Sequence, residues 1–265
     1  MKKLENKVAI VTGASTGIGE AIAKLFASEG AKLALAARSL DKLETLARSL
    51  GPDVLPLRTD MTDPTQIREM VRLTVERFGR LDILINNAGV GLYGTFAEMP
   101  PEHLQHLVAT NWLGPAYAIQ AAIPYLRKQR RGQIINISSV AGKVAIPWMT
   151  AYSSTKFALN ALSYGLRMEL EEDNIQVISV CPGRIKTPFN ANAFKDASTS
   201  PLPPGGISPE RVARAILRAS LRGTREIIVP AGNWSFVWFH FPIPGIVDWM
   251  MVRYLRRGMR KPDNS

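Results

Sequence analysis

The chain has 265 residues and a single cysteine, so it is long enough for one large core but cannot form an internal disulfide. Hydrophobic residues make up 46% and charged residues 21%, the balance of an ordinary soluble globular protein. The net charge of +11 favours anionic partners: nucleic acid, acidic lipid or a phosphorylated small molecule. No recognition motif for nucleic acid accompanies this charge, so we expect no nucleic-acid partner.

Apolar runs of strand length alternate with amphipathic stretches along most of the chain. The runs predict β-strands at Val8–Thr12, Lys32–Ala37, Val54–Arg58, Ile83–Asn86, Gln133–Ser138, Gln176–Cys181 and Glu226–Val229. The amphipathic stretches predict helices at Gly19–Glu29, Leu40–Leu50, Pro64–Phe78, Pro101–Arg127, Ala151–Asp173 and Pro209–Arg222. Repeated β-α units predict an α/β fold, a doubly wound parallel sheet of Rossmann type with about seven strands and helices on both faces.

A glycine-rich turn, T-G-A-S-T-G-I-G at Thr12–Gly19, follows the first predicted strand. Glycines let the backbone turn tightly and approach a pyrophosphate, while the amides and dipole of the next helix favour its negative charge. The spacing is G-x-x-x-G-x-G, and its place after an N-terminal strand favours a dinucleotide site over simple structural punctuation. The residues predicted to contact the cofactor here are Gly13, Ser15, Thr16, Gly17, Ile18 and Gly19.

The second predicted strand ends in Ala37, Arg38 and Ser39. An acidic residue at this position would bind the adenosine ribose hydroxyls and repel a 2′-phosphate. Here Ala37 leaves room and Arg38 can form a charge-assisted fork to phosphate, so Arg38 and Ser39 predict NADP(H) rather than NAD. The alternative is an arginine at a solvated helix start.

Tyr152 and Lys156 lie four residues apart, which places a phenol and an ammonium on one helix face. A phenol has a pKa of about 10, and a nearby ammonium is expected to lower it. Tyr152 can then give a proton to a developing alkoxide or take one from an alcohol. Taken alone, Y-x-x-x-K is common by chance and indicates no more than surface helix residues.

Other polar residues follow predicted strands and so converge on the same sheet edge. Ser139 follows one strand, Asn86–Gly89 ends another, and Pro182–Thr187 follows the sixth, while Asn111 opens or interrupts the helix after Gly89. Open α/β sheets bind their ligands at the carboxyl ends of the strands. This convergence gives Tyr152 a functional interpretation.

From Lys7 to about Val229 the sequence resembles the short-chain dehydrogenase/reductase family, and no catalytic position departs from its pattern. The resemblance implies that Tyr152 is the catalytic acid/base and that Ser139 holds the substrate oxygen. It implies that Lys156 binds the nicotinamide ribose and lowers the pKa of Tyr152, and that Asn111 holds a water linking Lys156 to solvent. The motifs that carry it are T-G-x-x-x-G-x-G at 12–19, N-N-A-G at 86–89, Asn111, Ser139, Y-x-x-x-K at 152–156, and P-G at 182–183 with Thr187.

The resemblance also implies further cofactor contacts and an assembly. Asp60 and Met61 resemble the adenine-binding position, and the nicotinamide would sit against the P-G motif. A homodimer or homotetramer would form through the two long helices. The cofactor residues so implied are Asp60, Met61, Asn87, Ala88, Gly89, Tyr152, Lys156, Pro182, Gly183, Ile185 and Thr187.

A long loop, residues 188–206, is the expected substrate loop within a catalytic domain of residues 1–230. Its Phe189 and Phe194, with Trp148, Met149 and Tyr93, predict an apolar pocket; an exposed linker is the alternative. No metal site is expected. The histidines are scattered, no cluster of cysteine or acidic residues accompanies them, and we expect them at the surface: His103, His106 and His240.

Residues 231–265 form an aromatic and basic C-terminal extension, with a helix expected from Ile246 to about Arg257. Its prolines oppose a membrane-spanning helix, which leaves a peripheral membrane contact through residues 234–260, or a cover for the pocket or an oligomer interface. The start of the chain has no apolar signal region, and Cys181 lies in a buried strand, so we expect a cytoplasmic protein.

Together these features predict an oxidoreductase that transfers a hydride between NADP(H) and the carbonyl or secondary alcohol of an apolar, lipid-like or steroid-like small molecule. One alternative is a reductase of the same fold that acts on polar or thioester-linked substrates. The other is a non-catalytic NADP-binding sensor, which the complete set of Asn111, Ser139, Tyr152 and Lys156 disfavours.

Overall fold

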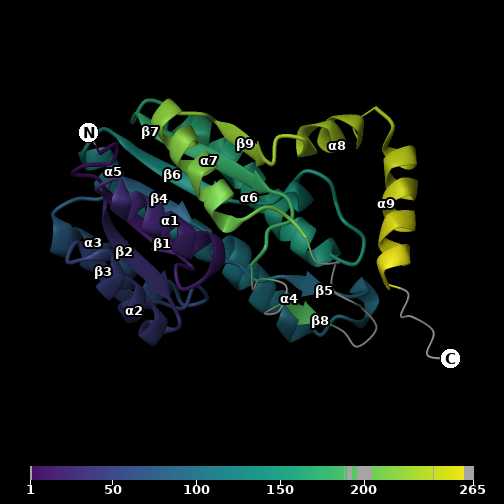
Figure 1. Ribbon diagram of the computed structural model, residues 1–265, viewed down its shortest axis with the longest axis horizontal. Helices are drawn as coiled ribbons and strands as arrows, with labels where there is room; N and C mark the ends of the chain where they lie inside the picture. The colour runs from purple at the N-terminus through teal and green to yellow at the C-terminus, as the bar shows by residue number, and fades with distance from the viewer. Residues whose placement is uncertain (1, 188, 190–192, 196–204, 241, 260–265) are drawn as a thin grey trace.

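The computed structural model describes residues 2–187, 189, 193–195, 205–240 and 242–259. All seven predicted strands are confirmed, each to within about one residue at either end, and they form one parallel sheet in the order β3-β2-β1-β4-β6-β7-β9 (Figure 1). The strands are β1 Val8–Thr12, β2 Lys32–Ala37, β3 Val54–Arg58, β4 Ile83–Asn86, β6 Gly132–Ile137, β7 Ile175–Pro182 and β9 Glu226–Val229.

The strand order reverses between β1 and β4, which pair directly. The segments that follow β1 and β4 therefore turn to opposite faces of the sheet, which leaves a crevice at the carboxyl ends of these two strands. Both strands are buried along their whole length because helices cover each face of the sheet. The crevice is thus set in a rigid frame.

Helices cover both faces of the sheet. One core contains Val11 of β1 with α1, α2 and α7, and the other contains Ile10 with α3, α5 and α6, so successive residues of β1 face opposite layers. The helices are α1 Gly17–Ser28, α2 Leu40–Leu50, α3 Pro64–Phe78, α4 Pro101–Val108, α5 Gly114–Lys128, α6 Thr150–Glu169 and α7 Pro209–Arg222. The single-domain Rossmann-type fold predicted from the alternation of elements is confirmed.

The predicted long helix Pro101–Arg127 is interrupted. A π-helical turn, η2 at Ala109–Leu113, separates α4 from α5 and contains Asn111. Pro115 has no backbone N–H to donate to the carbonyl of Asn111, so an uninterrupted α-helix would lack this hydrogen bond. The interruption places Asn111 next to the chain leaving β4, as described below.

A second, two-stranded sheet lies outside the predicted elements. A short strand β5, Leu92–Tyr93, pairs in parallel with β8, Phe194–Lys195, inside the expected substrate loop. The imidazole of His103 stacks on Phe194 with 4.2 Å between ring centroids. Residues 188, 190–192 and 196–204 of that loop, with Pro188, Pro201, Pro203 and Pro204, lie outside the described residues.

The C-terminal extension forms two helices, α8 Asn233–His240 and α9 Pro244–Met259. The helix expected from Ile246 is confirmed, whereas α8 was not expected because its aromatic run has no clear helical period. In Figure 1, α9 stands at the side of the molecule, away from the main sheet. None of the described helices is long and apolar enough to cross a membrane.

Candidate active site

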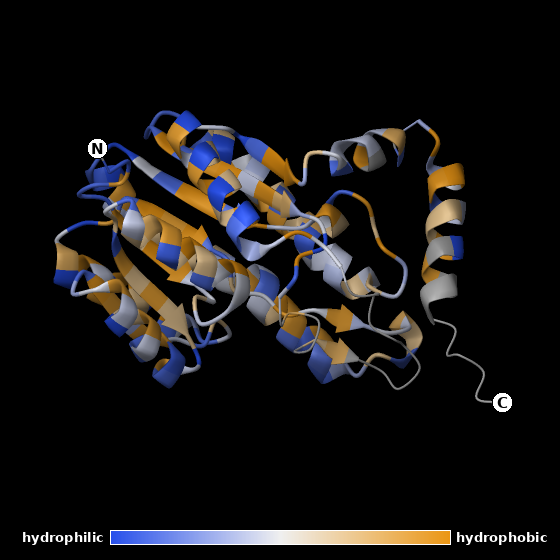
Figure 2. Ribbon diagram, viewed as in Figure 1, coloured by the Kyte–Doolittle hydropathy of each residue, from blue (hydrophilic) through white to orange (hydrophobic). Residues whose placement is uncertain are grey.

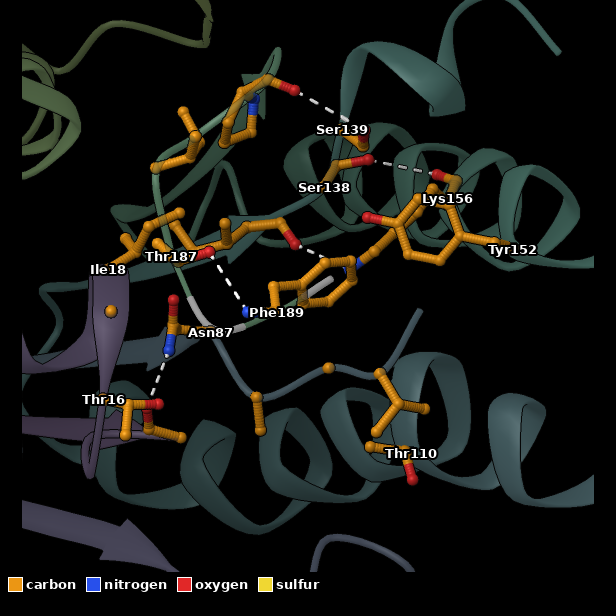
Figure 3. A pocket seen from close by; sticks show the side chains of 18 of the residues that line it. Thr16, Ile18, Asn87, Thr110, Ser138, Ser139, Tyr152, Lys156, Thr187 and Phe189 are labelled. Atoms are coloured by element: carbon orange, nitrogen blue, oxygen red, sulfur yellow. Dashed lines mark hydrogen bonds between the residues drawn. The ribbon is translucent and has the colours of Figure 1, made fainter. Parts of the chain in front are cut away.

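A cavity of about 700 Å³ opens at the carboxyl ends of the strands, and Figure 3 shows the side chains around it. It is lined by segments that follow β1, β2, β3, β4, β6 and β7, as the sequence predicts. Of the predicted site residues, Gly19 and Asn111 do not line it. Those that do are Gly13, Ser15, Thr16, Gly17, Ile18, Arg38, Ser39, Asp60, Met61, Asn87, Ala88, Gly89, Ser139, Tyr152, Lys156, Pro182, Gly183, Ile185 and Thr187.

The glycine-rich turn is packed tightly against the chain leaving β4. Gly13 has a φ of +63°, and a Cβ there would lie 2.8 Å from the Cα of Ala88. A Cβ on Gly19 would overlap the carbonyl oxygen of Gly13. These two glycines therefore let protein segments approach each other, and their close approach to a pyrophosphate stays a prediction.

The N-terminus of α1 faces the cavity. Thr16 is the N-cap residue, but its side chain makes no capping hydrogen bond, and Thr16, Gly17 and Ile18 all line the cavity. First-turn amides have no partner within a helix and carry its positive dipole end, so they form a site for an anion. Asn87 holds the turn in place through hydrogen bonds from its Nδ2 to the carbonyls of Thr12, at 2.9 Å, and Gly13, at 3.1 Å.

The far end of the cavity, at the end of β2, is basic. Arg38 is exposed there, and Lys42, in the first turn of α2, also lines the cavity. No described carboxylate forms a salt bridge with either side chain, so both remain available to an anionic ligand. Asp60, which follows the neighbouring strand β3 and also lines the cavity, accepts hydrogen bonds from the amide and the hydroxyl of Thr62, at 2.9 and 2.8 Å. The sequence interpretation missed Lys42, although its spacing of four from Arg38 is a usable signal.

At the other end, three polar groups meet inside the protein. Tyr152 and Lys156 on α6 are 6% and 3% exposed, and Lys156 Nζ lies 5.8 Å from the centroid of the Tyr152 ring. Ser139, which follows β6, hydrogen-bonds the Tyr152 side chain, and its Oγ accepts from the amide of Ala141 at 3.0 Å. Lys156 Nζ donates to the carbonyl of Ile137 at 3.0 Å. The sequence prediction that Ser139, Tyr152 and Lys156 share one cleft agrees with this geometry.

Burial, rather than the neighbouring charge, governs the pKa values of this pair. Desolvation raises the pKa of Tyr152 well above its usual value, and the hydrogen bond with Ser139 lowers it only partly. Desolvation also lowers the pKa of Lys156 to about 8. The sequence predicts a lowered phenol pKa through Lys156, whereas burial makes the net shift of the Tyr152 pKa upward. The lysine loses much of its own preference for the charged form, and its ammonium is bound to a backbone carbonyl.

Comparison with known proteins agrees with this geometry. Residues 7–198 match the family model described as short chain dehydrogenase. The chain belongs to this family of oxidoreductases. An uncharacterized oxidoreductase of Staphylococcus saprophyticus is 37% identical over 222 residues, which are 82% of this chain and 90% of that protein.

Two solved structures are similar to this short-chain dehydrogenase. An alcohol dehydrogenase from Thermococcus sibiricus, complexed with 5-hydroxy-NADP, has a TM-score of 0.75 and 31% identity, covering 84% of this chain and 95% of that one. A short-chain dehydrogenase/reductase from Burkholderia phymatum, in complex with NAD, has a TM-score of 0.84. It is 24% identical, covers 100% of both chains, and shows the fold alone.

Asn111 of this short-chain dehydrogenase is fully buried behind the cavity wall. Its Oδ1 accepts from the amide of Val90 at 2.8 Å, and its Nδ2 donates to the carbonyl of Val90 at 2.9 Å and to Thr155 Oγ1 at 3.3 Å. A Cβ on Gly89 would lie 3.2 Å from Asn111 Oδ1 and 3.6 Å from Lys156 Nζ. The Asn111 side chain therefore fixes the turn beside Lys156, and the water path through Asn111 stays a prediction.

The substrate end of the cavity is largely apolar. Tyr93, Met149 and Phe189 line it as predicted, and the Phe189 ring lies 5.8 Å from the Tyr152 ring, nearly edge-on. The prediction for Trp148 is wrong, because its side chain packs toward α9 instead. Phe194 is also outside the cavity wall, where it stacks on His103. The pocket is thus built from fewer aromatic side chains than the sequence suggests.

Besides Lys42, the sequence interpretation missed several residues that line the cavity of this short-chain dehydrogenase, among them His106, Asn233 and Arg184. His106 lines the wall and is half-buried, although a surface position was expected. Asn233 comes from the start of α8, beyond the expected catalytic domain. Arg184 lies within the predicted P-G motif, and its buried Nη2 has no hydrogen-bond partner among the residues that the structure describes. Among the described residues, no group of three or more His, Cys, Asp and Glu side chains could hold a metal ion.

Proposed function

We propose that the protein transfers a hydride between NADP(H) and the carbonyl or secondary alcohol carbon of an apolar, lipid-like or steroid-like substrate. The observation that carries this proposal is the meeting of Ser139, Tyr152 and Lys156 at the apolar end of one cavity. The opposite end of the same cavity is basic and contains a helix N-terminus. Such a cavity suits an extended, phosphorylated cofactor whose reactive ring reaches the tyrosine.

The residues present fit a nicotinamide dinucleotide. When bound, this cofactor gives or takes the hydride. The uncapped first turn of α1, at Gly17 and Ile18, would hold the diphosphate, and Asp60 and Met61 would flank the adenine. Pro182, Gly183, Ile185 and Thr187 would seat the nicotinamide, because they stand at the end of β7 or just after it and line the same cavity as Tyr152.

Arg38 and Lys42 support NADP(H) over NAD. The residue that ends β2 is Ala37, so no carboxylate stands at that position to repel a 2′-phosphate. The similar structures are complexed with 5-hydroxy-NADP in one case and with NAD in the other, so family membership alone does not choose. The choice rests on the charge of these two side chains.

Tyr152 would act as the proton donor in reduction. Its raised pKa keeps the phenol protonated at neutral pH, which suits donation to an oxygen that gains negative charge. The hydroxyl of Ser139 would orient the same oxygen and stabilise its charge. Lys156, with a pKa of about 8, can supply a proton near neutral pH, and Phe189 beside the phenol helps to exclude water.

Substitution of the phenol tests the proposal. Tyr152→Phe removes the proton donor and should lower kcat for NADPH-dependent ketone reduction by at least about a hundredfold. Binding of NADPH, followed by its fluorescence, should be largely retained. The matched control is Tyr164→Phe on the same helix, where the ring is 64% exposed and turnover should not change. Near-full turnover by Tyr152→Phe would show that the proposed chemistry is wrong.

A second candidate follows from Arg184, whose buried Nη2 has no hydrogen-bond partner within the described part of the chain. A buried guanidinium nitrogen without a partner is costly unless a ligand supplies an acceptor. Arg184 lies close enough to Tyr93 to lower the pKa of that phenol, so it lies at the substrate end. The second candidate is a substrate that carries a carboxylate or phosphate remote from its carbonyl.

Paired substrates separate the two candidates. Arg184→Leu should raise KM for a keto acid by about tenfold, the loss of one charge-assisted hydrogen bond, and leave KM for its methyl ester unchanged. Lys186→Leu, at an exposed neighbouring position, is the control. If the variant handles acid and ester as the wild-type protein does, the second candidate is excluded.

A further inference from the structure

The last two helices expose a group of large apolar side chains. Trp238 is 71% exposed and Trp249 is 62% exposed, far more than is usual for tryptophan. Figure 2 shows apolar residues along α9, the helix at the side of the molecule. We call the following residues the C-terminal apolar surface: Trp234, Trp238, Phe239, Ile243, Ile246, Trp249 and Met250.

This surface is separate from the face that attaches α9 to the protein. Val247, Met251 and Leu255 recur at intervals of four and are buried, and the last two pack with Val144 and with Trp148. These three side chains are enough to attach α9 to the rest of the protein. Ile246, Trp249 and Met250 are extra apolar residues on the outside, and large exposed apolar patches mark interaction sites.

The charge beside the surface indicates the chemistry of the partner. The guanidinium of Arg253 lies 5.6 Å from the centroid of the Trp249 ring. In the sequence, Arg256, Arg257, Arg260 and Lys261 follow. Asp248 on α9 contacts His240 at 3.2 Å, which links α9 to α8. Aromatic and apolar residues next to several basic residues fit the interface of an anionic bilayer.

A second copy of the chain fits this surface less well. A symmetric contact would place the basic residues of both copies in one interface, and like charges in an interface oppose association. Anionic lipid headgroups neutralise that charge instead. We propose that the C-terminal apolar surface binds an anionic lipid bilayer, with α9 lying in the interface rather than crossing it.

Bilayer binding would occur next to the substrate end of the cavity. Ile146 lines the cavity and also packs against the cluster of Met251 and Leu255. Asn233, the first residue of α8, lines the cavity as well. The surface could therefore bring the enzyme to an apolar substrate dissolved in lipid, and this part of the inference rests on the proposed function.

Vesicle co-sedimentation of the full chain tests the proposal. Wild-type protein should bind phosphatidylcholine vesicles that contain phosphatidylserine, and binding should weaken without phosphatidylserine or at high salt. Trp238→Ser and Trp249→Ser should each weaken binding by about tenfold, because one large apolar side chain leaves the interface. The control is Leu221→Ser on α7, an exposed leucine that is not part of this surface.

Two further measurements keep the inference separate from the activity. Tyr152→Phe should bind vesicles as the wild-type protein does, so loss of turnover does not affect this test. Failure of the wild-type protein to bind, or equal binding by all variants, overturns the proposal. So does light scattering that shows a Trp249-dependent dimer in a protein that binds no vesicles, because the surface would then join two copies.

Discussion

The two ends of the cavity obey different electrostatics. At the catalytic end, Tyr152 and Lys156 are almost completely buried, and desolvation shifts both pKa values toward the neutral forms. At the basic end, Arg38 is exposed to solvent, which screens its charge. One protein thus keeps its groups neutral at the end where proton transfer is proposed and charged at the end where a phosphate is proposed to bind. Substitutions should therefore have large effects at the first end and modest effects at the second.

The largest effect is expected from Lys156→Met, which removes the buried amine but keeps the length of the side chain. Turnover should fall by about a thousandfold, because proton supply to Tyr152 is lost. The free energy of unfolding should not fall, because an apolar side chain replaces a buried charge. Steady-state kinetics and urea unfolding of the same sample measure both. A variant that is both inactive and clearly less stable would contradict this prediction, because Lys156 would then be needed for folding as well as for turnover.

Gly19→Ala tests the packing between the two ends. The new Cβ would overlap the carbonyl oxygen of Gly13, so the free energy of unfolding should fall by about 2 kcal/mol. Gly245→Ala is the matched control, since no heavy atom lies within 4 Å of its Cβ position. Urea denaturation compares the two variants. Equal stability of both would mean that the turn relaxes without cost.

Arg38→Leu probes the exposed end. It should raise KM for NADPH by about tenfold and leave KM for NADH unchanged, because the lost contact is to the 2′-phosphate. Lys42→Leu should have a smaller effect, since an ammonium is a point charge without a bidentate fork. An equal rise of KM for NADPH and NADH would mean that Arg38 does not contact the 2′-phosphate.

The smallest effect concerns pH. The folded pKa of Lys156, about 8, lies below its unfolded value of about 10.4, so between these values the unfolded state binds more protons. The contribution of Lys156 to the free energy of unfolding is therefore lowest below pH 8 and rises as the pH increases toward 10. From pH 8 to 9, wild-type protein should gain about 1 kcal/mol relative to Lys156→Met. Tyr152 and Cys181 are present in both proteins, so their effects cancel.

Most of the strands and helices, and many of the residues that line the cavity, could be predicted from the sequence. Buried strands such as β1 and β4 are short apolar runs followed by polar or glycine residues. Their bounds, and the site residues that follow them, can therefore be recognised in a short stretch of sequence. Arg184 lay within a recognised motif, but the absence of a partner for its Nη2 depends on the fold. Asn233 reaches the cavity from α8 because of tertiary packing, which no local pattern records. The direction of the Tyr152 pKa was missed because burial cannot be read from a spacing of four residues.

The contact between Asn233 and the P-G turn has a practical consequence. A Cβ on Gly183 would overlap the Asn233 side-chain amide, so the two segments interlock where the nicotinamide is proposed to sit. The last 35 residues are therefore not a detachable handle. Cutting the chain after β9 would remove part of the cavity wall together with α8 and α9. Single substitutions on the outer face of α9 therefore separate the proposed lipid binding from catalysis more cleanly.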